Sequence, residues 1–333
     1  MTTEVLITEN VGGRWLDELK KKFAVTIEPD LWKSPDKIKA MLPGCRALIV
    51  RNQTHVNADL LSAAAKLEVI GRAGAGLDNI EVPTATAKGI VVVSTPDQNS
   101  ISVAELAIGM MLGLARKIPA ANQHAHDGGW ERQRFVGTEL YGKNFGVVGL
   151  GRIGFLTALR ARALGMNILA HDNYISPDAV AVAETRAELL RLDDLLAQSD
   201  FVSCHMPLTP ETKHFFNYER FCRMKPSAFF LNLARGEVVD EQGLIRALQE
   251  KKIGGAGLDV REQEPPAPSP LAGMENIILT PHIAAFTREA QDRVLAAVCQ
   301  DVIAVLEGRA TKNSVNFPKP KTSSPKSGGN RKL

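Results

Sequence analysis

The apolar residues of this chain fall into short continuous runs, separated by longer segments in which they recur every three or four positions. Short apolar runs predict buried strands, and here they occupy residues 5–7, 47–50, 69–71, 145–148, 167–171 and 229–234. Recurrence at helical spacing predicts helices at residues 13–22, 58–64, 102–117, 155–164 and 287–307. Strands that alternate with helices are typical of parallel sheets with helices packed on their faces.

The order of these elements predicts two α/β domains. A first alternating series occupies residues 1–98, and a second occupies residues 99–285. The last helical segment would pack back on the first domain, so we expect residues 286–317 to complete it and the second domain to be inserted into it. With 333 residues and 44% hydrophobic content, the chain is long and apolar enough to form two cores.

A glycine motif lies at the start of the second series, where residues 145–154 read FGVVGLGRIG. In this pattern Gly149 permits a tight turn, Gly151 lets the backbone approach a diphosphate, and Gly154 lets the following helix pack closely on the strand. The helix N-terminus presents N–H groups to the anion. Asp172 closes the next predicted strand, where an acid accepts hydrogen bonds from ribose hydroxyls and repels a 2′-phosphate. The motif therefore predicts an NAD site, the alternatives being a structural glycine turn and an ordinary turn aspartate.

Three residues that follow strand-like segments are candidates for catalysis. Arg235, after residues 229–234, can bind a carboxylate through two hydrogen bonds and polarise the neighbouring carbonyl. His282 can give or take a hydroxyl proton, because imidazole titrates near neutrality. Glu264 can accept the other imidazole N–H and stabilise the imidazolium, and Glu262 is an alternative for that role. A surface arginine and a structural histidine are the other interpretations of Arg235 and His282.

Two arginines of the first series also follow predicted strands, Arg51 after residues 47–50 and Arg72 after residues 69–71. Ligands of open parallel sheets bind at the carboxyl ends of the strands. Both arginines are therefore candidates to bind an anionic substrate, and salt-bridged surface residues are the alternative.

Charge and cysteine content exclude several classes of protein. The net charge is +3, but the segment from residue 311 onward carries six basic residues and no acidic one, which leaves −3 for the remainder. We therefore expect no nucleic-acid binding, and a disordered basic tail at residues 318–333. The four cysteines are scattered, so no metal site is expected. No apolar run approaches a membrane span and no signal peptide is evident, which favours a cytoplasmic protein.

Further motifs complete a recognisable set: GRAGAGLDNI at residues 71–80, NLARG at 232–236, GLDVREQEP at 257–265 and PHIAA at 281–285. Together with the glycine motif, they resemble the D-isomer specific D-2-hydroxyacid dehydrogenases over residues 5–317, and within that family the catalytic portion of the D-3-phosphoglycerate dehydrogenases. The resemblance implies a Rossmann-type, doubly wound NAD-binding domain, inserted into a smaller flavodoxin-like substrate-binding domain. It also implies a homodimer that forms through the cofactor domains.

The resemblance assigns roles residue by residue. It implies that Arg235 binds the substrate carboxylate, that His282 is the acid/base and that Glu264 is its partner. The implied cofactor contacts, besides the three motif glycines, are Arg152, Ile153, Asp172, Met206, Leu233, Ala234, Asp259 and Ala285. The implied substrate contacts are the backbone of Ala73, Gly74, Ala75 and Gly76, with Arg51, Arg72 and Arg132 for a phosphate group.

The expected reaction is the NAD-dependent interconversion of 3-phosphoglycerate and 3-phosphohydroxypyruvate, which belongs to serine biosynthesis. The chain departs from the phosphoglycerate subgroup at Leu233, Arg261, Asn173 and in the segment of residues 284–286. Two alternatives therefore stay open. One is the same reaction on another acid, such as hydroxypyruvate, glyoxylate or a sulfonated acid, and the other is a non-enzymatic, corepressor-like NAD-binding protein.

Overall fold

The computed structural model describes residues 3–317, so the tail expected at residues 318–333 lies outside the described residues. The described residues divide into two compact units, one made of residues 3–98 and 291–317 and the other of residues 99–290. Residues 286–290 thus join the second unit, whereas the sequence analysis places them in the first domain. A hydrogen bond between the hydroxyls of Ser102 and Thr287, 2.8 Å long, ties this segment to the second unit.

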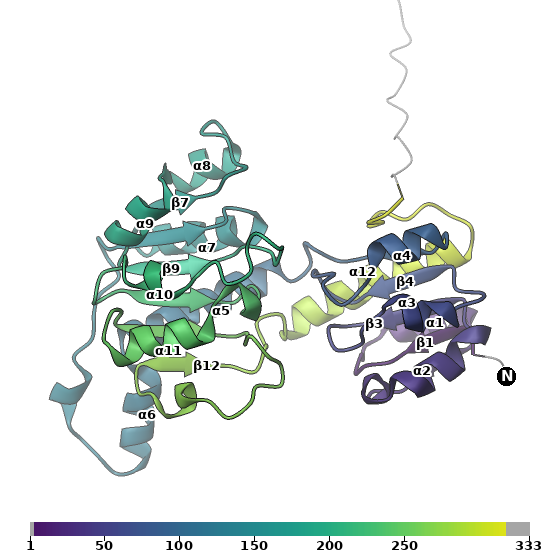
Figure 1. Cartoon of the computed structure of the whole chain (residues 1–333), viewed down its shortest axis with the longest axis horizontal. Helices are drawn as coiled ribbons and strands as arrows, with labels where there is room; N and C mark the ends of the chain where they lie inside the picture. Colours follow the sequence, from purple (N-terminus) through teal and green to yellow (C-terminus); the bar gives the residue numbers. More distant parts are fainter. Residues whose placement is uncertain (1–2, 318–333) are drawn as a thin grey trace, which may run out of the picture. The chain divides into compact units, whose positions relative to one another are not determined.

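The first unit contains a five-stranded parallel sheet in the order β2-β1-β3-β4-β5 (Figure 1). Its strands are β1 (Val5–Ile7), β2 (Val25–Ile27), β3 (Ala47–Val50), β4 (Val69–Arg72) and β5 (Val91–Val93). This strand order is that of flavodoxin-like sheets. The expected fold class of this unit is confirmed.

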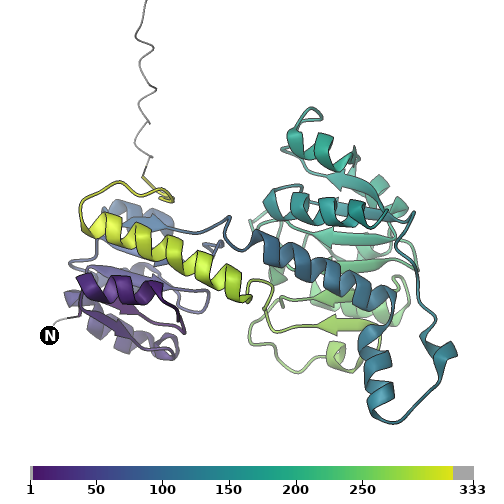
Figure 2. The ribbon, with the colours of Figure 1, turned by 180° about the vertical axis from the view of Figure 1, so that it is seen from behind.

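Helices cover both faces of this sheet. One face carries α1 (Trp15–Lys22) and the long α12 (Arg288–Leu306), which Figure 2 shows in front of the strands. The other face carries α2 (Pro35–Met41), α3 (Ala58–Ser62) and α4 (Val82–Ala87). Two short 3-10 turns, η1 (Leu31–Lys33) and η2 (Leu42–Gly44), complete the unit. Because both faces are buried, the strands are continuously apolar, as the sequence pattern indicates.

The second unit contains a seven-stranded parallel sheet in the order β12-β11-β10-β9-β6-β7-β8. Its strands are β6 (Asn144–Val148), β7 (Asn167–His171), β8 (Glu188–Leu189), β9 (Phe201–Cys204), β10 (Phe229–Asn232), β11 (Gly255–Leu258) and β12 (Ile277–Leu279). If β6 is counted as the first strand of this sheet, the order is 7-6-5-4-1-2-3, which is the Rossmann order with one further strand at the edge. The strand order reverses between β6 and β9, the position where ligands bind in such sheets.

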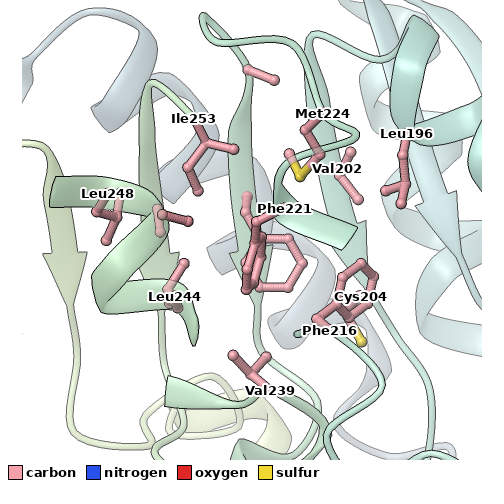
Figure 3. Close-up of a cluster of buried hydrophobic side chains, with 14 of the residues drawn as sticks. Leu196, Val202, Cys204, Phe216, Phe221, Met224, Val239, Leu244, Leu248 and Ile253 are labelled. Atoms are coloured by element: carbon pink, nitrogen blue, oxygen red, sulfur yellow. The ribbon is translucent and has the colours of Figure 1, made fainter. Parts of the chain in front are cut away.

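Two helical layers and two cores enclose the second sheet. One layer consists of α5 (Ser100–Ala115), α7 (Arg152–Ala163) and α8 (Val180–Thr185). The other consists of α9 (Leu192–Gln198), α10 (Tyr218–Phe221) and α11 (Glu241–Gln249). Figure 3 shows the core beneath the second layer, which contains Phe216, Phe221, Leu244 and Leu248. The remaining segments are α6 (Ile118–His126) and the turns η3 (Arg132–Phe135), η4 (Gly236–Val238) and η5 (Pro270–Gly273).

The helix predicted at residues 102–117 differs at both ends. It begins at Ser100 without a side-chain cap, and the hydroxyl of Ser102 bonds that of Thr287. The helix ends at Ala115, and Pro119 occupies the first turn of α6, where its missing N–H is tolerated. Among the described residues, no helix combines the length and apolar character needed to cross a bilayer.

Candidate active site

The glycine motif forms the turn between β6 and α7. Gly149 has a φ of +93°, which favours glycine, and its N–H donates to the carbonyl of His171 at 2.9 Å. A side chain at Gly154 would overlap the carbonyl oxygen of Gly149, whereas the space beside Gly151 is open. α7 begins at Arg152, with Gly151 before it and no side-chain cap. The turn therefore leaves room for an anionic group at a helix N-terminus.

Asp172 follows β7 beside this turn. One carboxylate oxygen accepts the N–H of Leu150 at 2.8 Å, and the other accepts the N–H of Tyr174 at 2.9 Å. Each oxygen of an ionised carboxylate can accept a second hydrogen bond. The structure thus brings Asp172 to the glycine turn and holds it there with capacity for hydroxyl donors.

A half-buried histidine that the sequence analysis missed, His205, supports the same turn. Its N–H donates to the carbonyl of Val148 at 2.8 Å, and its own carbonyl packs against Gly149. The ring nitrogen Nε2 lies 2.9 Å from the hydroxyl of Ser203, and burial lowers the pKa of His205 to about 4. His205 is therefore neutral near pH 7 and precedes Met206, one of the expected cofactor contacts. Its position directly after an apolar run is the signal that could have revealed it.

Arg235 follows β10 in a turn organised by Asn232, whose side chain is buried. The Asn232 amide donates to the carbonyl of Arg235 at 2.8 Å and accepts the N–H of Ala234 at 3.1 Å. One guanidinium nitrogen of Arg235 donates to the carbonyl of Ala234 at 2.7 Å. Leu233, within the same turn, is buried in the core and anchors it.

The imidazole of His282 and the carboxylate of Glu264 meet directly. His282 Nδ1 lies 2.7 Å from Glu264 Oε2, and their side chains are 36% and 32% exposed. The N–H of Arg261 donates to the second oxygen, Oε1, at 3.1 Å. Burial acts to raise the pKa of Glu264, but the hydrogen bond and charge of His282, the Arg261 N–H and the charge of Arg235 together hold that pKa below its ordinary value. The carboxylate is therefore ionised at neutral pH, as a partner of an imidazole must be.

Glu262, the alternative partner, binds a different histidine. Its Oε1 lies 2.6 Å from Nε2 of His214, and its Oε2 accepts the N–H of Glu241 at 3.3 Å. The loop after β11 thus supplies the glutamates of two histidine–glutamate pairs. The geometry favours Glu264 over Glu262 as the partner of His282.

Asp259 organises the segment that carries His282. Its buried carboxylate accepts the Thr280 hydroxyl at 2.6 Å, the Ile283 N–H at 2.8 Å and the Ala284 N–H at 2.9 Å. Its backbone carbonyl accepts the N–H of His282 at 2.8 Å. Resemblance alone assigns Asp259 a cofactor contact. The structure adds that both carboxylate oxygens hold residues 280–284, which also positions Ala285.

Two of the arginines expected to bind the substrate, Arg51 and Arg72, lie side by side at the ends of strands in the first unit. Arg51 and Arg72 follow neighbouring strands, since Val50 of β3 pairs with Arg72 of β4. The Arg51 guanidinium donates to the side chain of Gln291 at 2.8 Å. Burial lowers the pKa of Arg51, an effect that the charge of Glu9 partly offsets. Arg72 donates to the carbonyl of Ala73 at 2.9 Å, at the start of the loop formed by residues 73–76.

The other expected phosphate contact, Arg132, begins η3 in the second unit and is exposed. Arg134 of the same turn forms an ion pair with Glu275, 3.2 Å long, which connects this segment to the body of the unit. A role for Arg132 stays a prediction. Among residues 3–317, no group of three or more His, Cys, Asp or Glu side chains is arranged to hold a metal ion.

Comparison with known proteins matches residues 108–284 to the family described as D-isomer specific 2-hydroxyacid dehydrogenase, NAD binding domain. The chain is 45% identical over 315 residues to a D-3-phosphoglycerate dehydrogenase of Mycobacterium bovis, with 95% of this chain and 57% of that protein covered. It is 42% identical over 316 residues to that of Archaeoglobus fulgidus, with 95% and 59% covered. The chain thus spans less than two thirds of the length of these relatives.

Among solved structures, the chain is similar to the D-lactate dehydrogenase of Aquifex aeolicus in complex with NAD and lactic acid. The TM-score is 0.85 and the identity 30%, with 95% of this chain and 100% of that chain covered. This similarity extends over both units of the present chain.

Proposed function

The chain belongs to the D-isomer specific 2-hydroxyacid dehydrogenase family of NAD-dependent oxidoreductases, and we propose that it interconverts 3-phosphoglycerate and 3-phosphohydroxypyruvate. The observation that carries the dehydrogenase chemistry is the 2.7 Å contact between His282 and Glu264, beside the charge of Arg235. The similarity to phosphoglycerate dehydrogenases supports the substrate.

The residues of the glycine turn fit NAD. The open backbone at Gly151 and the uncapped N-terminus of α7 suit a pyrophosphate, and Asp172 suits the ribose hydroxyls. When bound, NAD accepts the hydride from C2 of the hydroxyacid or returns it to the ketoacid. The further cofactor contacts that we propose are Arg152, Ile153, Met206, Leu233, Ala234, Asp259 and Ala285.

His282 moves the proton of the reaction. In oxidation, the neutral imidazole removes the proton of the C2 hydroxyl, and the ionised Glu264 stabilises the imidazolium that results. In reduction, the imidazolium returns that proton to the carbonyl oxygen. Arg235 binds the substrate carboxylate and polarises the adjacent carbonyl. Reduction therefore requires the protonated histidine, and oxidation requires the neutral one.

The phosphorylated substrate carries a second anionic group, for which we propose Arg51, Arg72 and Arg132, while the backbone of residues 73–76 binds the carboxylate. A second candidate function is the same reaction on lactate or another 2-hydroxyacid, because the chain is also similar to a D-lactate dehydrogenase. In that case, the three arginines would have no phosphate to bind.

Oxidation of NADH with a panel of 2-ketoacids tests the substrate: 3-phosphohydroxypyruvate, hydroxypyruvate, glyoxylate, pyruvate and 3-sulfopyruvate. We expect the highest kcat/KM with the phosphorylated acid. Arg51→Ala should raise its KM by about 10- to 150-fold, the value of a hydrogen bond to a charged group. The matched control is Arg46→Ala, because Arg46 precedes β3, pairs with Glu68 at 2.6 Å and should leave KM within threefold.

Each other outcome of the panel points elsewhere. A higher kcat/KM with an unphosphorylated acid would favour the second candidate function. Equal losses in Arg51→Ala and Arg46→Ala would remove Arg51 from the substrate site. NAD binding without turnover of any acid would favour a non-catalytic NAD-binding protein.

We further propose that the protein is a homodimer formed through its cofactor domain. Helix α6 contains no buried residue, and the segment that follows exposes Trp130 and Val136 by 83% and 66%. A second copy of the chain would cover these apolar side chains. Light scattering should give twice the chain mass, and Trp130→Glu should give the monomer, while Tyr174→Glu, at another exposed aromatic residue, should not.

A further inference from the structure

A bidentate ion pair between Arg261 and Glu241 lies beside the proposed catalytic pair of His282 and Glu264. Arg261, in the loop after β11, donates from Nε and Nη2 to the two carboxylate oxygens of Glu241 at 2.8 and 2.9 Å. Their side chains are only 11% and 13% exposed. Glu241 is the first residue of α11 and also accepts the N–H of Glu262 at 2.8 Å. The start of this helix therefore holds both the side chain and the backbone of the loop.

The same loop holds Glu264. The N–H of Arg261 donates to Glu264 Oε1 at 3.1 Å, while Glu264 Oε2 binds His282. On its other side, the peptide between Arg261 and Glu262 packs directly against Gly236, where any side chain would overlap the Arg261 carbonyl. Gly236 adjoins Arg235, so this peptide also connects the loop to the proposed carboxylate-binding arginine.

We propose that Glu241 and Arg261 are positioning residues, which hold the loop so that Glu264 binds and orients the imidazole of His282. This inference rests on the proposed acid–base function of His282. The guanidinium of Arg261 acts from within the loop, through its own N–H, and touches no reacting atom. A bidentate arginine–carboxylate contact restricts both partners geometrically, which a single hydrogen bond does not.

Loss of Glu241 should loosen this arrangement in two ways. It leaves the guanidinium of Arg261 buried without its counter-charge, and it frees the N–H of Glu262. The loop would then shift to solvate the arginine, and the Arg261 N–H would leave Glu264. The other charged groups around Glu264, which are Arg235 and His282, lie on the loops after β10 and β12. A misplacement of about 1 Å can lower a rate by about 100-fold.

The test compares Glu241→Ala and Arg261→Met with the parent protein by two measurements. The first is a long-range ¹H–¹⁵N spectrum of cofactor-free, ¹⁵N-histidine-labelled protein, with the His282 signals assigned by their loss in His282→Asn. We expect one ring tautomer, Nδ1–H, in the parent and a mixture in both variants. The second is kcat, which should fall by about 10- to 100-fold in each variant, with KM for ketoacid within threefold. The kcat of the double variant should fall no further than that of the more impaired single variant, since the two residues act as a unit.

The matched control is Asp200→Asn. Asp200 also binds a cation and a backbone N–H, those of Lys225 and Asn144 at 2.9 Å each. It precedes β9, however, and so lies at the amino ends of the parallel strands, whereas Glu264 and His282 follow the carboxyl ends of theirs. It should change neither the tautomer nor kcat. If Glu241→Ala fails to fold, Glu241→Gln, which keeps the side-chain volume, replaces it.

An unchanged tautomer in the folded variants, or an equal loss of kcat in Asp200→Asn, would overturn the positioning role. A parent protein that turns over no ketoacid would instead overturn the proposed function. The tautomer measurement would still decide whether Glu241 and Arg261 position Glu264.

Discussion

The second unit contains two histidine–glutamate pairs that look alike in isolation. His282 lies 2.7 Å from Glu264, and His214 lies 2.6 Å from Glu262. The histidines are 36% and 44% exposed, and the glutamates 32% and 35%. Both histidines have left-handed backbones, with φ of 56° and 51°. Neither distance, exposure nor backbone conformation separates the proposed catalytic pair from the second pair.

The surroundings of the two pairs differ. Asp259 holds the backbone of His282 through the residues on either side of it, and the charge of Arg235 acts on Glu264. His214 is held by one backbone hydrogen bond, to the carbonyl of Glu237 at 2.7 Å. A histidine–carboxylate contact therefore suits acid–base chemistry under two conditions. A rigid loop must orient the histidine, and a nearby cation must be able to bind the substrate.

The strongest test of this difference is His282→Asn, which keeps a hydrogen-bonding side chain but cannot exchange the proton. We expect kcat to fall by about 10²- to 10⁴-fold, the usual contribution of a positioned acid or base. Steady-state kinetics with NADH and the preferred ketoacid measures this loss. Turnover within tenfold of the parent would remove His282 from the mechanism.

The next largest effect is expected from Asp259→Asn, which weakens the loop but leaves the histidine. The amide places a donor opposite the Ala284 N–H, and a buried donor without a partner costs about 1–3 kcal/mol. The loop should shift, with kcat lower by about 100-fold. Urea unfolding and kinetics measure the two effects separately.

Asp301→Asn is the matched control for Asp259→Asn. Asp301 is also buried and accepts the N–H of Lys312 and the amide of Asn313, but it lies on α12 in the first unit. It should lower the free energy of unfolding by a similar amount and leave kcat within threefold. If kcat fell equally in both variants, the loss would reflect stability and not the position of His282.

The sequence predicted some parts of this site better than others. The glycine turn and Asp172 form one continuous strand–helix–strand unit, so local spacing places them correctly. Glu262 and Glu264 could not be separated, because residues two apart in an extended segment point the same way. The contact with His214, 48 residues away from Glu262, decides between them. The role of Asp259 and the presence of His205 were missed for the same reason, since their partners become neighbours only in the folded sheet.

A loss of kcat of about the same size or smaller is expected from Glu264→Gln, which keeps the hydrogen bond but removes the charge that stabilises the imidazolium. A hydrogen bond to a charged group contributes about 1.5–3 kcal/mol, so kcat should fall by about 10- to 150-fold. Without the carboxylate, more acid is needed to keep the imidazole protonated, and the alkaline limb of the reduction profile should move to lower pH. The profile of kcat against pH, with a ketoacid as substrate, measures this shift.

At acidic pH, the same profile should show a second transition, which comes from Glu264 itself. Because the pKa of Glu264 lies below its ordinary value, the parent keeps the carboxylate ionised until the pH falls through this lowered pKa. The stability that the ionised carboxylate contributes is lost over the same range, below its ordinary pKa. Glu264→Gln should abolish this acidic transition. An identical profile in both proteins would mean that Glu264 does not act on His282.

The smallest effect is expected from the second pair, in His214→Asn and Glu262→Gln. An exposed ion pair contributes about 0–1 kcal/mol, so neither variant should unfold at a measurably different urea concentration. Both should keep kcat within threefold and the parent pH profile, although Glu262 lies only two residues from Glu264. A loss in His214→Asn as large as that in His282→Asn would reverse the assignment of the two pairs. It would also mean that the held loop and the nearby arginine do not distinguish a catalytic histidine from its neighbour.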